Sequence, residues 1–194
     1  MDKELTINIL QVLYGDAITV RFYGKDNKYH NIFIDAGLPW TYVRTLKEAT
    51  EKVIASHEKI DLFVITHIDQ DHIGAISQFI TEYGDKDIVN MYWFNGGYYE
   101  VFLENGNKIS YRQGINLADY LFKIGKVYKK PITSELEPVD LFGAKITIVA
   151  PLNEDLKKFL SKMKKEENRI KSEKINAKEA DWNKEEYELV KNSF

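Results

Sequence analysis

The chain has 194 residues, of which 44% are hydrophobic and 13% aromatic, so it can bury the core of one ordinary domain and is neither disordered nor collagen-like. Its 27 Lys and Arg against 30 Asp and Glu give a net charge of −3, which excludes a global basic field for nucleic acid. Because cysteine is absent, disulfides and thiolate metal sites are excluded, and a transition metal would need His and carboxylate ligands.

Strands are predicted first along the chain. Apolar and polar residues alternate at 5–13 and at 17–23, and 31–35 is a short apolar strand that ends at Asp35. Residues 39–56 have the spacing of a helix whose inward face comprises Val43, Leu46, Ala49, Val53 and Ile54. The first part of the chain therefore predicts a small sheet followed by a helix.

The middle of the chain predicts a central strand with a functional loop. Residues 61–66 are almost all apolar, as expected of a strand that is buried on both faces. A polar loop at 67–72 and a helix at 73–83 follow it. Further on, the pattern predicts a strand at 89–94, a helix at 115–124 and a hairpin at 139–149 that turns at Gly143-Ala144. Strands thus lead and helices follow them, which indicates an α/β or α+β fold with a mixed sheet.

The composition shifts after Pro151, where Lys and Glu become dense. We therefore divide the chain into 1–150, which contains the sheet, and 151–194, a charged helical extension of the same domain. The extension carries apolar residues at helical spacing, namely Leu152, Leu156, Phe159, Leu160 and Met163. The charges are expected to form a solvated helix face.

The residues that carry chemistry gather in segment 66–74, Thr-His-Ile-Asp-Gln-Asp-His-Ile-Gly. The segment follows the buried strand, so it lies at a carboxyl strand end, where sites collect in α/β sheets. His67 and Asp69 can project to one side of an extended loop, while Asp71 and His72 face a neighbouring point. This spacing fits two metal ions about 3.5–4 Å apart, which activate water and polarise an ester or phosphodiester.

A structural interpretation of the same residues exists. Asp71 is suited to cap the following helix, and the two histidines of the segment can be hydrogen-bonded loop residues. Their combination in one loop after a buried strand favours the metal site. Of the other histidines, His30 is expected on the surface of a hairpin, and His57 is expected near the C-terminal carbonyls of a helix.

The segment resembles the first metal-binding motif of the metallo-β-lactamase superfamily, which usually reads His-x-His-x-Asp-His and precedes a helix. With Asp69 in place of the second His, it is similar to the metallo-β-lactamase-like domain of bacterial DNA-uptake (competence) channel proteins. Residues 12–18, 32–37 and 93–96 are similar to further pieces of that branch, in the same order. The resemblance covers about residues 5–150.

This resemblance implies a sandwich of the αββα type and two divalent metal ions. The implied ligands are His67 and Asp69 for one ion and Asp71 and His72 for the other. Asp71 would also orient the nucleophilic water, and Asp35 would support the site from behind through hydrogen bonds. Asp16 is either a second supporting residue or only a turn residue. The carboxylate of Asp69 shifts the preference from a pure zinc site toward Zn, Mn or Mg with phosphate-type substrates.

The later family ligands, a bridging Asp after a Gly and further histidines, do not follow His72 in this sequence. We therefore expect the first half of the sandwich, with an apolar sheet face that invites a dimer or a second subunit. The first hypothesis is a metal-dependent hydrolase of esters or phosphodiesters, with nucleic acid as the preferred substrate on family analogy. The alternative is a truncated or degenerate member without catalysis that acts as an interaction subunit. A redox or glyoxalase-type member is less favoured because Asp69 departs from the usual His.

The sequence also bears on location. No apolar run approaches the roughly 20 residues that cross a bilayer, and the charged beginning of the chain does not read as a signal peptide. We therefore expect a cytoplasmic protein without a membrane partner.

Overall fold

A computed structural model describes residues 4–96 and 108–176 of the chain. Its strands are Thr6–Ile9 (β1), Ile18–Tyr23 (β2), Tyr29–Ile34 (β3), Ile60–Ile65 (β4), Tyr92–Phe94 (β5), Val139–Leu141 (β6) and Ala144–Ile146 (β7). Its helices are the 3-10 helix Pro39–Arg44 (η1) and the α-helices Leu46–Ala55 (α1), Gln70–Ile73 (α2), Ile76–Tyr83 (α3), Lys108–Lys123 (α4) and Asn153–Asn176 (α5). None of the described helices is long and apolar enough to cross a membrane.

The first five strands form one mixed sheet in the order β1-β2-β3-β4-β5, and β6 and β7 pair separately. Neighbours are antiparallel from β1 to β3 and parallel from β3 to β5. The carboxyl ends of β3 and β4 therefore meet at the same edge of the sheet, where the loops that follow them lie side by side. This mixed sheet with helices confirms the predicted α/β class.

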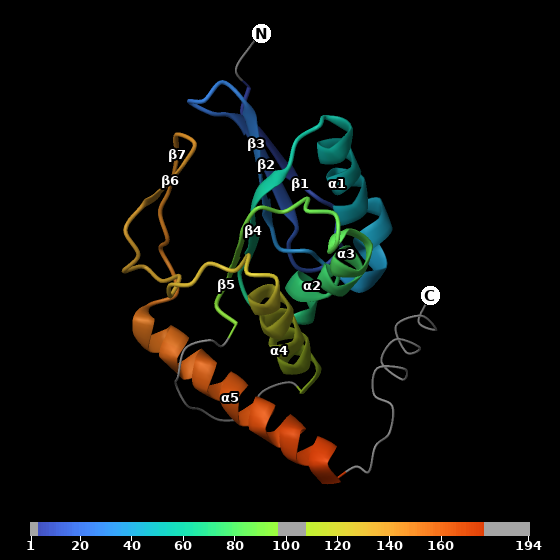
Figure 1. The fold of residues 1–194 in the computed structure, drawn as a ribbon, viewed down its shortest axis with the longest axis vertical. Coiled ribbons are helices and arrows are strands. Elements are labelled where there is room, and N and C mark those ends of the chain that lie inside the picture. The colour runs from blue at the N-terminus through green and yellow to red at the C-terminus, as the bar shows by residue number, and fades with distance from the viewer. Residues whose placement is uncertain (1–3, 97–107, 177–194) are drawn as a thin grey trace.

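The two faces of the sheet are covered differently, as Figure 1 shows. Helices α1 to α4 lie on one side, over a core that contains Phe33, Phe63 and Phe79. The β6–β7 hairpin lies on the opposite side, where Leu62 and Trp93 belong to a second and smaller apolar cluster. The second face thus has a two-stranded cover in place of a helical layer.

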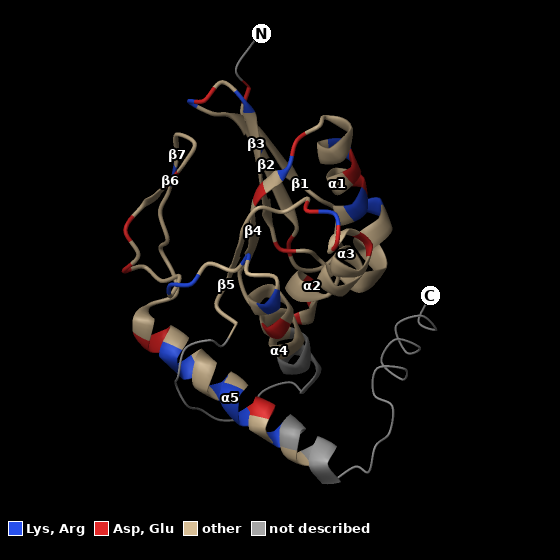
Figure 2. Cartoon of the chain, in the orientation of Figure 1, with Lys and Arg blue, Asp and Glu red and all other residues tan. Residues whose placement is uncertain are grey.

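Helix α5 supplies the predicted helical extension within the described residues, and the rest of it, 177–194, lies outside them. Leu156, Leu160 and Met163 form a buried stripe on α5, and Met163 reaches the core of the helix-covered face. Figure 2 shows Lys, Arg, Asp and Glu along much of the length of α5, and Glu154, Asp155, Lys157 and Lys158 are exposed. The solvated charged face predicted for this segment is therefore present in the described part of it.

The single helix predicted over 39–56 is wrong in detail. Residue Thr45, with φ −128° and ψ −89°, separates η1 from α1. Because a 3-10 helix has about 3.0 residues per turn instead of 3.6, Val43 leaves the expected inward face and is 61% exposed. Ile54 is also exposed, at 39%, so the buried face of α1 rests on Leu46 and Val53 instead.

Two further boundaries differ from the sequence prediction. The helix expected over 73–83 is broken at Gly74-Ala75, where the backbone N–H of Ala75 bonds to the carbonyl of Gly37. The hairpin turns at Phe142-Gly143, one residue earlier than expected, because both residues adopt a positive φ, as a tight two-residue hairpin turn requires.

The expected surface position of His30 is also wrong. Its ring is buried between the sheet and the hairpin, and the residue is 4% exposed. His57 follows α1 as expected, and its backbone N–H bonds to the carbonyl of Ile54.

Candidate metal centre

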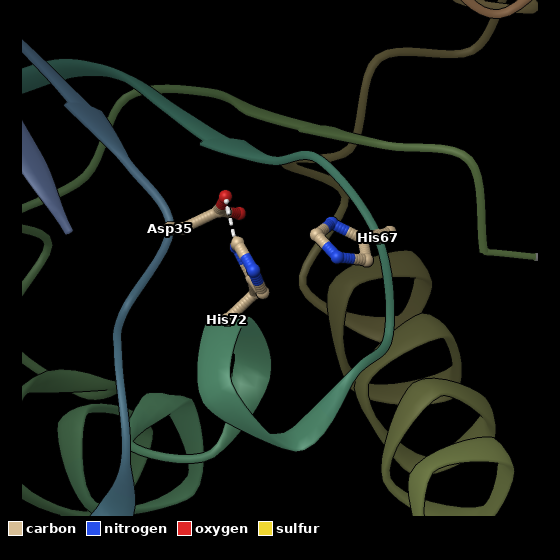
Figure 3. Close-up of side chains that lie close together, drawn as sticks. All are labelled: Asp35, His67 and His72. Carbon is tan, nitrogen blue, oxygen red and sulfur yellow. Dashed lines mark hydrogen bonds and ion pairs between the residues drawn. The ribbon is translucent and has the colours of Figure 1, made fainter. Parts of the chain in front are cut away.

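The candidate site is built by two parallel strands that end together. Asp35 follows β3 and Thr66 follows β4, and the backbone N–H of Asp35 bonds to the carbonyl of Val64 on the neighbouring strand. The chain then returns through α2, which carries His72 toward the same point (Figure 3). Asp35, His67 and His72 come together here, each with one potential ligand atom within 4.8 Å of the others.

Asp35 is the buried centre of the arrangement, with 2% of the residue exposed. Its Oδ1 accepts a 2.8 Å hydrogen bond from the backbone N–H of Thr66. Its Oδ2 accepts from the Thr66 hydroxyl at 2.6 Å and lies 3.0 Å from His72 Nδ1. These three contacts, one from backbone and two from side chains, leave the Asp35 side chain little freedom to move.

The backbone of Asp35 lies in the left-handed region, with φ at 57°. This conformation is uncommon outside glycine and costs about 1–2 kcal/mol, although Asp tolerates it better than most residues. Hydrogen bonds fix it from both sides, because the next residue, Ala36, donates its N–H to the carbonyl of His72 at 2.7 Å. Such strain persists where the surrounding structure over-determines it, which is typical of functional sites.

The hydrogen bonds to Asp35 also determine how both imidazoles are presented. The single hydroxyl hydrogen of Thr66 is given to Asp35, so the hydroxyl oxygen accepts from His67 Nδ1, which lies 2.8 Å away. His72 donates its own Nδ1 hydrogen directly to Asp35. When the ring is neutral, this arrangement leaves the lone pair of each imidazole on Nε2, the nitrogen that can then bind a metal ion. The two ring centroids are 3.9 Å apart.

Three more carboxylates lie beside the two imidazoles. Asp69 Oδ2 is 3.7 Å from His67 Nε2, and Asp71 Oδ2 is 3.7 Å from His72 Nε2. Asp16 Oδ2 approaches His72 Nδ1 to 3.9 Å from the loop between β1 and β2. The structure thus places one carboxylate 3.7 Å from the Nε2 of each histidine.

A glycine makes the approach of Asp16 possible. Gly15 has a φ of 76°, and a Cβ on it would lie 1.8 Å from the backbone oxygen of Asp71. Only glycine can occupy this position without moving the turn away from α2. The Gly15-Asp16 turn is therefore packed directly against the helix that carries Asp71 and His72.

The interpretation of Asp71 as a helix cap does not fit the structure. Asp69, not Asp71, is the N-cap residue of α2, and it makes no side-chain capping bond. Asp71 lies within the first turn. Both carboxylates are therefore available for a cation.

The charges of the site support a cation as its occupant. In the described part of the chain, no Lys or Arg forms an ion pair with Asp16, Asp35, Asp69 or Asp71. The histidines are the basic groups beside these carboxylates, and a divalent ion can offset the negative charge of the four. Imidazole and carboxylate are ligands of Zn and Mn, so the donor set fits the metals that the sequence predicts.

The structure gives Thr66 and Asp35 contacts that the sequence did not predict. Thr66 was not predicted as a site residue, although a hydroxyl directly before His67, at the end of a buried strand, is a usable signal. Asp35 makes the hydrogen bonds expected of a supporting residue and also lies in the three-residue group that can hold an ion. The individual roles of the six predicted site residues stay predictions.

Comparison with known proteins adds only a structural likeness. No family model matches the chain, and no curated protein matches it. It is similar to a mutant of a flavo di-iron protein from Thermotoga maritima, with a TM-score of 0.39 and 13% identity over 76% of this chain and 37% of that one. A flavoprotein from the same organism gives a TM-score of 0.38 and 12% identity over 75% of this chain and 36% of that one. The chain thus spans little more than a third of these proteins, and values this low assign neither family nor activity.

Proposed function

We propose that this chain is a metal-dependent hydrolase that holds two divalent ions at the carboxyl ends of β3 and β4. The observation that carries the proposal is the shared support of His67 and His72 by one buried carboxylate, Asp35, which leaves both Nε2 atoms free beside further carboxylates. Divalent ions in such a site polarise a phosphoryl or carbonyl oxygen and activate water.

In this proposal the residues of α2 and its preceding loop act in pairs. His67 and Asp69 hold one ion, and His72 and Asp71 hold the other. Asp71 is the catalytic residue, because its partly exposed carboxylate can accept a hydrogen bond from the attacking water and hold that water in place.

Other residues fix this arrangement without touching the substrate. Asp35 and Thr66 are positioning residues that keep both imidazoles in one tautomer. Asp16 adds negative charge from the opposite loop and makes the site more favourable for a divalent cation.

The preferred substrate class is the phosphodiester of a nucleic acid. Two features support it: the carboxylate of Asp69, which suits harder ions such as Mn and Mg, and the resemblance of segment 66–74 to DNA-uptake proteins. Zn remains an alternative ion, and carboxylic esters remain an alternative substrate.

The first test is metal content by elemental analysis of protein purified without chelator. About two ions per chain are expected in the wild type, and fewer than half of that in His67→Ala. His57→Asn is the matched control, because His57 is exposed, lies outside the site, and has a φ of 56° that Asn tolerates. A wild type that binds no Zn, Mn or Mg contradicts the proposal.

The second test is hydrolysis of bis(p-nitrophenyl) phosphate with Mn, Zn or Mg added. Asp71→Asn should lower kcat by about 100-fold or more while the variant keeps its fold. Unchanged kcat in this variant would remove Asp71 from the chemistry.

A second candidate function is a non-catalytic interaction subunit. The observation that favours it lies on β1, where Ile7 and Ile9 point to the same face of the sheet and are 59% and 79% exposed. In the sheet register they stand opposite Val20 and Ile18 of β2, so the apolar face continues to the edge strand. A second copy that covers this face would bury aliphatic surface that is otherwise in water.

Sedimentation measurements distinguish this candidate from the first. Ile7→Lys/Ile9→Lys should abolish self-association, whereas Thr6→Lys/Asn8→Lys alters the other face of the same strand and should not. Association that survives His67→Ala and Asp71→Ala, in a protein without hydrolysis, would favour the interaction subunit over the hydrolase.

A further inference from the structure

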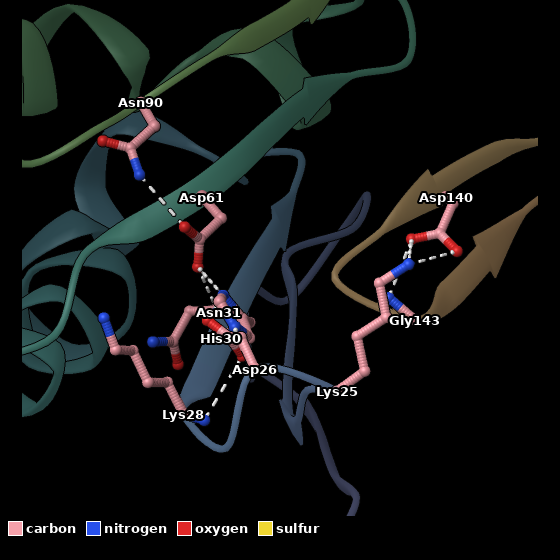
Figure 4. Close-up of polar contacts among 9 residues, drawn as sticks. All are labelled: Lys25, Asp26, Lys28, His30, Asn31, Asp61, Asn90, Asp140 and Gly143. Carbon is pink, nitrogen blue, oxygen red and sulfur yellow. Dashed lines mark hydrogen bonds and ion pairs between the residues drawn. The ribbon is translucent and has the colours of Figure 1, made fainter.

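The second imidazole-centred cluster of the structure lies away from the candidate metal centre, at the tip of the β6–β7 hairpin. His30 of β3 is buried there, and both of its ring nitrogens face carboxylates. Nδ1 lies 3.0 Å from Asp61 Oδ2, and Nε2 lies 2.9 Å from Asp26 Oδ1 (Figure 4). The ring is therefore clamped between the turn that precedes β3 and the neighbouring strand β4.

The surroundings of the ring favour a positive charge on it. Asp61, which faces Nδ1, also accepts hydrogen bonds from the backbone N–H of Asn31 and from the side chain of Asn90. The hydrogen bond from His30 is the largest of the effects that lower the pKa of Asp26. Because an ionised carboxylate only accepts hydrogen bonds, a carboxylate at each ring nitrogen favours imidazolium, the form of histidine that donates from both nitrogens.

A bulge in the sheet brings Asp61 to this position. In the register between β3 and β4, Asn31 pairs with Ile60 and Ile32 pairs with Leu62, so Asp61 is the extra residue. A bulge of this kind redirects a side chain that the regular pleat would point elsewhere. The carboxylate that faces His30 is therefore fixed by backbone geometry and not by a flexible loop.

The charged ring holds the tip of the hairpin. Phe142 stacks on His30, with ring centroids 3.7 Å apart and planes only 9° from parallel. A cation on the face of an aromatic ring is attracted by the negative potential of that face. Lys25 adds a backbone hydrogen bond to the carbonyl of Phe142 and a side-chain ion pair to both oxygens of Asp140. We call His30, Asp26, Asp61 and Phe142, with the Lys25–Asp140 pair, the hairpin latch.

Apart from the latch, apolar packing holds the hairpin on the sheet. In the described residues β6 and β7 form a sheet of their own, so no strand pairing joins them to the five-stranded sheet. Their apolar residues are only partly buried against the second apolar cluster. That cluster includes Trp93, which is 3% exposed.

We propose that the β6–β7 hairpin is a pH-sensitive lid over the second apolar face of the sheet, closed when His30 is protonated and released when His30 is neutral. Histidine is the side chain whose charge ordinarily changes between about pH 5 and 8. Loss of the proton leaves one nitrogen lone pair facing a carboxylate and removes the cation from the Phe142 stack. The charged groups around the ring are Asp26, Asp61, Lys25 and Asp140.

The test uses Trp93 as a reporter of the covered face. In a Trp40→Phe/Trp182→Phe background it is the single tryptophan of the chain, and its access to acrylamide measures opening. Between pH 5.5 and pH 9, the quenching constant should rise about threefold while the far-UV circular dichroism stays the same.

Two variants make the test decisive. His30→Gln has no titrating ring, and Phe142→Ala, at the partly exposed hairpin tip, removes the stack without touching the core. In both, quenching should be high at pH 5.5 and change little with pH.

Three results would overturn the proposal. The first is a quenching constant of Trp93 that does not change with pH in the background protein. The second is a Phe142→Ala variant whose quenching constant depends on pH as it does in the background protein. The third is a rise in quenching that accompanies loss of secondary structure.

Discussion

Thr66 and Asp35 are joined by two hydrogen bonds, although they are 31 positions apart in the sequence. The backbone N–H and the hydroxyl of Thr66 each donate to a different oxygen of the carboxylate, at 2.8 and 2.6 Å. Through the same hydroxyl, the buried charge of Asp35 reaches His67, while it contacts His72 directly. One carboxylate thus orients two imidazoles from two different segments, which makes the support of the site testable apart from its ligands.

The first prediction concerns Thr66→Val, which keeps the shape of the side chain and removes the hydroxyl. His67 then loses the acceptor that fixes its Nδ1 hydrogen, so its Nε2 is no longer held as the free nitrogen. We expect the affinity for Zn, measured by competition with a chelating dye, to fall by about 10- to 100-fold. Thr81→Val is the control, since Thr81 is exposed on α3 and bonds only within its helix. Equal affinities in the two variants would show that the Thr66 hydroxyl has no role in holding metal.

The second prediction concerns metal removal. A ligand that binds only the folded state stabilises it, by about 2.7 kcal/mol at a concentration one hundred times its Kd. Addition of Mn or Zn should therefore raise the Tm of the wild type, and a chelator should return it to the starting value. Asp71→Asn should show less than half of this rise, whereas Asp155→Asn, on the exposed side of α5, should keep it in full.

A Tm of the wild type that does not respond to any divalent ion would contradict a metal centre in these residues. A rise that is the same in Asp71→Asn would keep the metal but remove this carboxylate from its ligands.

The third prediction separates crowding from backbone strain at two glycines. Gly15 and Gly125 both have a positive φ, at 76° and 71°. A Cβ on Gly15 would lie 1.8 Å from the backbone oxygen of Asp71, whereas a Cβ on Gly125 would meet nothing within 4 Å. Gly125→Ala should therefore lower the free energy of unfolding by about 1 kcal/mol, which is the backbone strain alone. Gly15→Ala should lower it by about 3 kcal/mol or more, and urea denaturation measures both. Equal costs would mean that the turn at Gly15 moves freely away from α2.

The sequence predicted the parts of this molecule that depend on local pattern. The apolar run at 61–66 predicted β4, and the polar residues after it predicted a loop at a carboxyl strand end. The gathering of His67 and His72 near one point could be expected from their spacing within one segment. These features need no knowledge of distant residues, which is why periodicity and residue type were sufficient for them.

The features that escaped prediction depend on contacts between distant segments. The Thr66 hydroxyl gains its role only because β3 and β4 are parallel neighbours, which places Asp35 beside it. His30 looks like a surface residue in its own segment, and it is buried because the hairpin 112 positions later returns over it with Phe142. The break between η1 and α1 could not be predicted from the sequence either, because the residues on both sides of it have helical spacing.

The fourth prediction concerns the pH dependence of stability through Glu58, which joins β2, β3 and the end of α1. Arg21 donates to both of its carboxylate oxygens, at 2.6 and 3.0 Å, and Asn31 donates to one of them at 2.9 Å. The hydrogen bond from Arg21 is the main cause that lowers the pKa of Glu58 below its ordinary value of 4.5. The folded state therefore binds a proton here less readily than the unfolded chain does.

Because the pKa of Glu58 is lower in the folded state, its ionised carboxylate contributes to the free energy of unfolding. This contribution is fully present above the ordinary value of 4.5 and is lost as the pH falls through the lowered value. Glu58→Gln should reduce the free energy of unfolding at pH 7 by about 1 kcal/mol, a modest amount because more than a third of the Arg21 side chain is exposed to screening solvent. Near pH 2 the wild type and the variant should become equally stable by urea denaturation. Glu51→Gln is the control, since its ion pair with Lys47 is long and exposed, and it should change stability little at either pH. A difference for Glu58→Gln that persists at pH 2 would mean that packing, and not the charge of Glu58, stabilises this junction.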